Sequence, residues 1–291
     1  MNKNNQLMLT AARDLAKTLK PGAVIIYTDS LDELAGVRII SEIAPTILVA
    51  RTDKEERKAA EYSKRVVRAP NIDLGRLAQI NIAALLALSN NLINRGDIVI
   101  GLSGEAGSEL IDALLVVEIG ENFELLPEGA GPIGDEVKPP VFRRVLEVAT
   151  ELAAEGREAS PVGALFIVGD IETVLVHSTQ FIINPFKGYQ ESERNILDPQ
   201  LAETVKEFSL IDGAFLIRGD GIVVSAGTYL HPSEYGEPLP RGLGARHAVA
   251  AAITKSTRAI AITVSQSSGS TRIFRSGRIL MEIQKPTRRA K

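Results

Sequence analysis

The chain has 291 residues, of which 45% are hydrophobic and 24% charged, a globular composition that suits one large domain or two ordinary ones. Because it contains no cysteine, a disulfide framework and metal sites built on thiolates are excluded. The formal net charge of −3 hides an asymmetry, since residues 212–291 carry twelve Lys and Arg against five Asp and Glu, a net of +7.

The basic C-terminal segment suggests an anionic ligand, although a solvated tail explains part of its charge, because four of the cations lie in the last seven residues. No apolar run approaches the roughly 18–20 residues that span a bilayer. The first ten residues lack the basic start and apolar block of a signal peptide. We therefore expect a cytoplasmic protein without a membrane partner. Nucleic-acid binding is not expected, because no aromatic residues interleave with the basic ones.

In the first 120 residues, helical and strand-like segments alternate, which predicts an α/β domain with a mainly parallel sheet and helices packed on it. Its predicted helices cover residues 5–19, 29–41 (capped by Asp29-Ser30), 53–64 and 74–93. Its predicted strands cover residues 23–28, 46–50, 66–68 and 97–100.

A glycine-rich motif, Gly101-Leu-Ser-Gly104-Glu-Ala-Gly107, follows the last of these strands, where we expect it to open a helix. Glycines in that position can let backbone N–H groups approach a phosphate. The spacing matches neither a dinucleotide fingerprint nor a P-loop, so plain turn chemistry is the favoured alternative.

Residues 127–140 contain seven Pro or Gly in fourteen positions, which is typical of a linker. We therefore expect an N-terminal domain of residues 1–126 and a second domain of residues 127–291 that ends in the basic tail. The second domain is predicted to be α/β with a mixed sheet, because Asp220-Gly221 between two apolar runs indicates an antiparallel hairpin. Its predicted helices are 141–155, 199–208 and 245–254, and its predicted strands are 162–168, 173–177, 214–217, 222–226, 259–264, 271–274 and 279–283.

The three histidines, His177, His231 and His247, lie far apart and show no metal-binding spacing, so a zinc site has little support. No Gly-x-Ser-x-Gly elbow is present, which argues against a Ser-His-Asp hydrolase.

Four short segments of the second domain together indicate a nucleotide site. They are Asp212-Gly213-Ala214 before a strand, Gly227-Thr228-Tyr229-Leu230 at the hairpin end, Leu243-Gly244-Ala245-Arg246-His247 at a helix start, and Val264-Ser265-Gln266-Ser267-Ser268-Gly269 after a strand. Each alone has a plain reading as a turn, a helix start or a loop. Together they supply a helix N-terminus and an Arg fork for phosphates, serine hydroxyls, and the single carboxylate Asp212 for a metal or an attacking hydroxyl.

These segments, with Ile217-Arg218-Gly219 between the first two, resemble in this order the diadenylate cyclase (DAC) domain, a family recognised by Asp-Gly-Ala and Arg-His-Arg motifs at about this spacing. The resemblance covers roughly residues 127–285. With a preceding α/β domain, the whole chain is similar to the archaeal DacZ type of these enzymes. The first domain also resembles the C-terminal domain of pyruvate kinase, through its element pattern and Gly96-Asp97-Ile98-Val99.

The resemblance implies a nucleotidyltransferase that condenses two ATP into the second messenger cyclic di-AMP and releases two pyrophosphates. It implies catalytic roles for Asp212, Arg246 and His247, with Asp212 also binding a divalent metal, Mn²⁺ or Mg²⁺. It implies ATP-binding roles for Gly213, Ala214, Thr228, Tyr229, Leu230, Gly244, Ala245, Ser265, Ser267 and Ser268.

Two departures from the family pattern motivate an alternative. Ala248 replaces the third residue of the Arg-His-Arg motif, with Arg272 and Arg275 as candidate substitutes for the lost cation. The family's Ser-Glu-Glu-Thr-Gly loop reads Ser-Gln-Ser-Ser-Gly from Ser265, which removes both carboxylates. The alternative is a catalytically weakened nucleotide-binding sensor; a further one is a scaffold protein that binds no nucleotide.

The reaction has a consequence for assembly. Cyclic di-AMP is nearly two-fold symmetric, and the chain carries one copy of the motif set. We therefore expect a homo-oligomer whose active sites pair face to face between subunits, with ATP as substrate. The N-terminal domain is then a candidate for a regulatory or oligomerising role.

Overall fold

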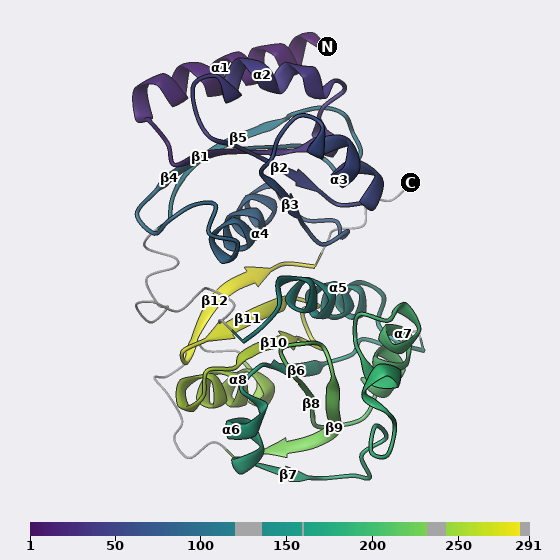
Figure 1. Ribbon diagram of the computed structural model, residues 1–291. Coiled ribbons are helices and arrows are strands. Elements are labelled where there is room, and N and C mark those ends of the chain that lie inside the picture. Colours follow the sequence, from purple (N-terminus) through teal and green to yellow (C-terminus); the bar gives the residue numbers. More distant parts are fainter. Residues whose placement is uncertain (120–135, 159, 232–242, 286–291) are drawn as a thin grey trace. The chain divides into compact units, whose positions relative to one another are not determined.

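The computed structural model describes residues 1–119, 136–158, 160–231 and 243–285 (Figure 1). The chain divides into two compact units, Met1–Glu124 and Leu125–Lys291. Most of the Pro- and Gly-rich stretch, residues 127–135, lies outside the described residues. Within the described ranges, no helix combines the length and apolarity needed to cross a membrane.

The N-terminal unit is built on a five-stranded sheet of order β3-β2-β1-β4-β5. Its strands are β1 Ala23–Tyr27, β2 Thr46–Ala50, β3 Val66–Arg68, β4 Ile98–Ser103 and β5 Ala113–Glu118. Its helices are α1 Lys3–Leu19, α2 Arg38–Ser41, α3 Asp53–Ala60 and α4 Arg76–Ser89. The first four strands run parallel, and β5 pairs antiparallel with β4 at one edge. The predicted, mainly parallel sheet with packed helices is confirmed.

Alternate residues of β1 face opposite layers of this unit. Val24 and Ile26 pack in one apolar cluster with residues of α1, including Leu9, and with Ala59 of α3. On the other face, the Tyr27 hydroxyl donates to the backbone oxygen of Gln79 in α4 at 2.8 Å. Both faces of the central strands are therefore covered, as their continuous apolar sequence requires.

Residues 29–41 do not form the single predicted helix. They contain a 3₁₀ turn at Leu34–Val37 and only the four-residue helix α2, after another 3₁₀ turn at Thr28–Ser30. The buried apolar side chains here recur every third residue, at Leu31, Leu34, Val37 and Ile40. That spacing matches three residues per turn, which explains the preference for 3₁₀ geometry.

The glycine-rich motif does not open a helix. After β4 ends at Ser103, an irregular loop leads directly into β5, an edge strand that the sequence analysis missed. A phosphate site at this motif would need the N-terminus of a helix, and the structure has none here.

The C-terminal unit contains a seven-stranded mixed sheet of order β12-β11-β10-β6-β8-β9-β7. Its strands are β6 Ala164–Val168, β7 Ser178–Gln180, β8 Ala214–Ile217, β9 Val223–Leu230, β10 Ile260–Val264, β11 Thr271–Arg275 and β12 Arg278–Ile283. Its helices are α5 Pro139–Glu155, α6 Ile171–Val176, α7 Pro199–Phe208 and α8 Ala245–Ser256. Only β6 and β8 pair parallel; all other pairs are antiparallel. The predicted α/β class with a mixed sheet is confirmed.

Helices cover both faces of this sheet. Residues of α6 and α8 share one apolar cluster with alternate residues of the central strands, such as Ile167 and Leu216. Figure 1 shows α5 and α7 on the opposite face. The short edge strand β7 was not predicted.

The predicted strand at residues 173–177 is wrong, because Ile171–Val176 forms the helix α6. The Thr173 hydroxyl donates to Asp170 Oδ1 at 2.7 Å and so stabilises the first turn. Ile171 and Val174, one turn apart, are buried, whereas Val176 is 79% exposed. Burial at helical spacing and the local hydrogen bond outweigh the strand propensity of Val and Thr.

Candidate functional site

A cavity of about 710 Å³ opens in the C-terminal unit where β8, β9 and β10 meet the start of α8. Its lining residues are Leu165, Phe181, Asp212, Gly213, Ala214, Thr228, Tyr229, Leu230, Gly244, Ala245, Arg246, His247, Val249, Val264, Ser265, Gln266 and Ser267. All predicted site residues except Ser268 are therefore brought together. Ser268 turns its hydroxyl to Ser270 Oγ, 2.7 Å away.

The Asp-Gly turn before β8 places a carboxylate at the cavity. The Asp212 side chain is 83% exposed, and its Oδ1 accepts a hydrogen bond from Arg246 Nη2 at 2.9 Å. Gly213 has φ +113°, and a Cβ there would lie 2.6 Å from the carbonyl carbon of Gly227. Only glycine fits this close approach, which joins the Asp212 turn to β9.

The N-terminus of α8 faces the same cavity. Gly244 is the N-cap, and it supplies no capping side chain. The first N–H groups of a helix have no partner inside the helix, and they carry the positive end of its dipole. Gly163 makes room for the Arg246 guanidinium, because a Cβ at Gly163 would lie 2.8 Å from Arg246 Nη1. Backbone donors and a cation are thus gathered beside Asp212, an arrangement suited to phosphate oxygens.

His247 is buried at the cavity wall. Arg272 Nη1 lies 3.0 Å from His247 Nε2, and Arg272 Nη2 donates to Glu282 Oε1 at 2.6 Å. A guanidinium can only donate, so Nε2 is an acceptor and the neutral ring carries its proton on Nδ1. Burial, reinforced by the Arg272 charge and opposed by Glu282, lowers the pKa of His247 below its ordinary value of 6.5.

Of the two candidate substitutes for the missing third cation, Arg272 contacts a residue of the cavity, His247. Arg275 instead donates through Nη1 to the backbone oxygen of Arg258. Arg272 does not line the cavity itself, so it acts on the site through His247.

The serine-rich loop connects β10 to β11. Ser265 Oγ lies 3.3 Å from Ser267 Oγ and also accepts from the Ser268 N–H at 3.3 Å. The Gly269 N–H donates to the Ser265 backbone oxygen at 2.9 Å, which closes the turn. Hydroxyls and the Gln266 amide therefore face the cavity where the family pattern has carboxylates.

Sequence reasoning missed five lining residues: Leu165, Phe181, Val249, Val264 and Gln266. Four of these are apolar, and with Ala214 and Leu230 they give one part of the cavity an apolar wall. Their motif neighbours could have indicated Val249, Val264 and Gln266. Leu165 and Phe181 lie outside every motif and reach the cavity only through strand pairing. The cavity thus combines an apolar region with a region of cations, hydroxyls and backbone donors, which suits a ligand with an aromatic part and an anionic part.

The donor set fits a divalent cation that shares its ligands with a substrate. Asp212 is the one carboxylate among the described lining residues, and no group of three or more His, Cys, Asp or Glu side chains forms a ready-made cage in the described ranges. Mg²⁺ is commonly held by one or two carboxylates together with substrate phosphates. The residues present are therefore sufficient for a metal that arrives with a nucleotide.

Comparisons with known proteins find similar sequences for both parts of the chain. Residues 151–279 match the family model described as "DisA bacterial checkpoint controller nucleotide-binding", and residues 4–126 match "Probable sensor domain DacZ_P". A diadenylate cyclase of Methanocaldococcus jannaschii is 37% identical over 299 residues, covering 92% of this chain and 93% of that protein. A diadenylate cyclase of Haloferax volcanii is 40% identical over 199 residues, covering 68% of this chain and 71% of that protein. A solved structure, the hypothetical membrane spanning protein from Bacillus cereus, matches at 22% identity and a TM-score of 0.37, covering 48% of this chain and 61% of that one.

Proposed function

The chain belongs to the diadenylate cyclase family, and we propose that it condenses two ATP into cyclic di-AMP and two pyrophosphates at the cavity around Asp212. The observation that carries the proposal is the convergence of four separate sequence segments on one cavity of about 710 Å³. The test is to incubate the pure protein with ATP and Mn²⁺ or Mg²⁺ and to identify the product by mass spectrometry. ATP binding without product would favour the weakened sensor, and no thermal shift with ATP and metal would favour the scaffold.

Binding divides between the two regions of the cavity. The apolar wall, with the backbone of Gly213 and Ala214, suits the adenine ring. The α8 N-terminus, Arg246 and the serine hydroxyls suit the triphosphate. A divalent ion, Mn²⁺ or Mg²⁺, held by Asp212 and the substrate phosphates would add neutralisation of phosphate charge.

The chemistry is an in-line substitution at phosphorus. The ribose 3′-oxygen of one ATP forms a bond to the α-phosphorus of the other, and the bond to the bridging oxygen breaks so that pyrophosphate leaves with the electron pair. Asp212 accepts the hydroxyl proton, and its bond to Arg246 fixes the orientation of the carboxylate. Positioning and charge stabilisation supply most of the rate in transfers of this type.

Two such substitutions close the ring, so two nucleotides must face each other. The chain has one copy of the site residues, and we therefore place the second ATP on a second copy of the chain.

When Asp212→Asn chains are co-expressed in about ninefold excess over wild-type chains, most wild-type chains face an inactive partner. Cyclic product per wild-type chain should then fall to about a tenth, with a linear dinucleotide accumulating. As a control, an equal excess of an unrelated protein should leave the product per wild-type chain unchanged. If the Asp212→Asn chains also leave it unchanged, pairing between subunits is contradicted.

Arg272 provides a test of the His247 environment. Replacing Arg272 with Gln removes the neighbouring positive charge, so the pKa of His247 should rise toward 6.5. The chain has three histidines, so NMR titration of the ring Cε1 protons, with His247→Gln for assignment, follows His247 directly. Lys187→Gln, at an exposed lysine, is the charge-matched control. If Arg272→Gln leaves the pKa of His247 unchanged, the contact between Arg272 and His247 is contradicted.

The lowered pKa of His247 also makes the stability of the fold depend on pH. As the pH falls below 6.5, the unfolded ring binds a proton before the folded ring does, so the free energy of unfolding decreases.

A further inference from the structure

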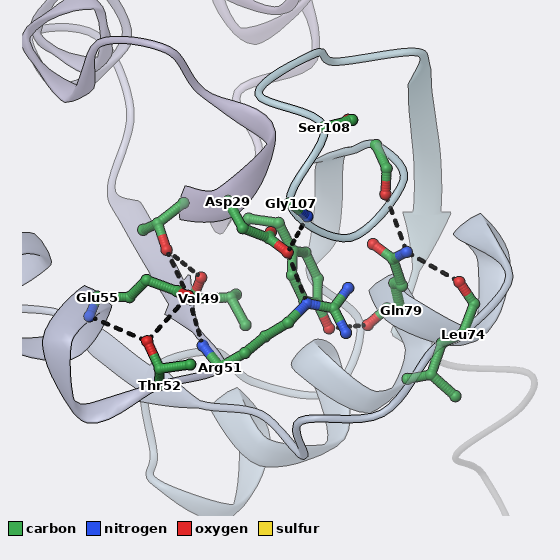
Figure 2. A network of polar contacts seen from close by, with 12 residues as sticks. Asp29, Val49, Arg51, Thr52, Glu55, Leu74, Gln79, Gly107 and Ser108 are labelled. Atoms are coloured by element: carbon green, nitrogen blue, oxygen red, sulfur yellow. Dashed lines mark hydrogen bonds and ion pairs between the residues drawn. The ribbon is translucent and has the colours of Figure 1, made fainter.

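A second group of polar residues, far from Asp212 in sequence, lies in the N-terminal unit at the carboxyl ends of its parallel strands. The strand order reverses at β1, since β2 and β3 lie on one side and β4 on the other. Open α/β sheets bind ligands in the crevice at such a switch point. Asp29 and Ser30 follow β1 here, Arg51 follows β2, and Ser103 ends β4. Gln79 of α4 completes the group, which we call the switch-point cluster; Figure 2 labels its members Asp29, Arg51 and Gln79.

The switch-point cluster is buried but incompletely hydrogen-bonded. Each of its side chains is less than 10% exposed, and Ser30, Gln79 and Ser103 are fully buried. Six of its atoms have no hydrogen-bond partner among the described residues: Asp29 Oδ1, Ser30 Oγ, Arg51 Nε and Nη2, Gln79 Oε1 and Ser103 Oγ. Arg51 Nε still lies 2.9 Å from Asp29 Oδ2 as an ion pair, which leaves five. Leaving a buried polar atom unpaired costs about 1–3 kcal/mol, and native proteins keep such atoms rare. Five of them at one sheet edge indicate that another molecule supplies the partners.

The remaining polar atoms of Asp29, Arg51 and Gln79 are held by contacts with other groups of the protein. Asp29 Oδ2 forms an ion pair with Arg51 Nε at 2.9 Å and accepts a hydrogen bond from the Gly107 N–H at 3.2 Å. Arg51 Nη1 donates to the Ile72 backbone oxygen at 2.7 Å, and its guanidinium lies 4.8 Å from the ring centre of Tyr27. Gln79 Nε2 donates to the backbone oxygens of Leu74 and Gly104. Figure 2 shows these contacts from one side. The unpaired atoms are therefore held in place in advance, which reduces the entropy lost on binding.

The charges exclude an anionic ligand. The Asp29 carboxylate already neutralises the charge of Arg51 and engages its Nε and the Gly107 N–H, so a phosphate would find no net positive charge here. The glycine-rich motif therefore binds a carboxylate of the protein itself. The unpaired atoms comprise two acceptors, Asp29 Oδ1 and Gln79 Oε1, one donor, Arg51 Nη2, and two hydroxyls that can do either. Neighbouring hydroxyl groups match this set, because each can donate to an acceptor and accept from the guanidinium.

We propose that the switch-point cluster binds a small uncharged polyhydroxy molecule, a polyol or a monosaccharide. Residues 104–110 form the loop through which it enters. Glu105 to Glu109 are exposed, and the Gly107 and Glu109 N–H groups both donate to Asp29. The loop is also held by Asn5 Nδ2, which donates to the Glu109 backbone oxygen, and by Gln79 Nε2, which donates to that of Gly104, so entry requires these contacts to open as well.

Binding is tested on the full chain with glycerol, erythritol, ribose and glucose as probes, and with inorganic phosphate and glycine as charged comparators. Millimolar concentrations keep general stabilisation by polyols small. Calorimetry should show saturable binding of at least one polyhydroxy probe and none of phosphate or glycine. The double variant Ser30→Ala/Ser103→Ala should weaken that binding at least about fivefold, since each of the two lost hydrogen bonds contributes roughly 0.5–1.5 kcal/mol. The matched control is Ser41→Ala, whose exposed hydroxyl bonds only within its own segment, to the Arg38 backbone oxygen, and it should bind as the wild type does.

The double variant should fold, because neither hydroxyl has a partner to lose; Ser103→Ala alone serves if it does not. Its cyclic di-AMP synthesis should be unchanged, so failure here is distinguishable from failure of the cyclase proposal. Three results would overturn the inference: binding of phosphate in place of the polyhydroxy probes, equal binding by the double variant, or no binding of any probe. In the last case, ordered water alone satisfies the cluster.

Discussion

Asp212→Asn should lower the rate of cyclic di-AMP formation by about three orders of magnitude and leave the fold intact. Removal of a positioned base typically costs 10²–10⁴-fold, and the neutral amide also loses the charge that would hold a divalent ion. No other carboxylate among the described lining residues can take its place. The fold should tolerate the change, because the ion pair with Arg246 is exposed and such pairs contribute about 0–1 kcal/mol.

The measurement is initial-rate product formation at saturating ATP and metal, with thermal unfolding alongside. Glu172→Gln is the matched control, since Glu172 is an exposed carboxylate of the same unit that does not line the cavity. That control should retain the wild-type rate. If Asp212→Asn turns over at more than about a tenth of the wild-type rate, the catalytic role assigned to Asp212 is wrong.

Gly213→Ala should destabilise the C-terminal unit by about 3 kcal/mol, a fall in Tm of roughly 10 °C, and should abolish ATP binding. Two costs add. The backbone stays at φ +113°, which a residue with a Cβ rarely adopts, and the new methyl group meets the backbone of Gly227 and Thr228 at 2.6–2.7 Å. Relief of that clash must move β9 away from the Asp212 turn, and both line the cavity.

Gly188→Ala separates the two costs. Gly188 also has a positive φ, +96°, but a Cβ there would meet nothing within 4 Å. It should therefore lose only the backbone term, about 1–2 kcal/mol, and bind ATP normally. Equal destabilisation by the two variants, measured by denaturant unfolding, would show that the contact with Gly227 is not the cause.

The sequence predicted those features that depend on local pattern. The strand at residues 46–50 and the helix at residues 199–208 match β2 and α7 to the residue, because apolar runs and an Asp-Pro start mark their ends. Segment 173–177 failed because Thr and Val favour a strand, whereas burial of Ile171 and Val174 favours a helix. Burial depends on the tertiary fold, which local propensity does not contain.

The candidate site shows the same division. Motif residues at the boundaries of elements were found, such as Asp212 before β8, Gly244 before α8 and Ser265 after β10, because the turn and cap chemistry that places them is local. Leu165 lines the cavity by way of the β6–β10 pairing, and Arg272 contacts His247 from another element. No pattern of sequence spacing indicates that Leu165 lines the cavity or that Arg272 contacts His247. Contacts between strands depend on the order of the strands in the sheet, which was not predictable here.

The chain from Glu282 through Arg272 to His247 has a consequence for how the enzyme is made. Arg272 lies in β11 and Glu282 in β12, both of which follow α8 and its His247 in the sequence. The site motifs are therefore complete in sequence before the strands that support His247 have paired. A chain truncated before Glu282 would carry every one of those motifs but would lack the carboxylate that holds Arg272 beside His247.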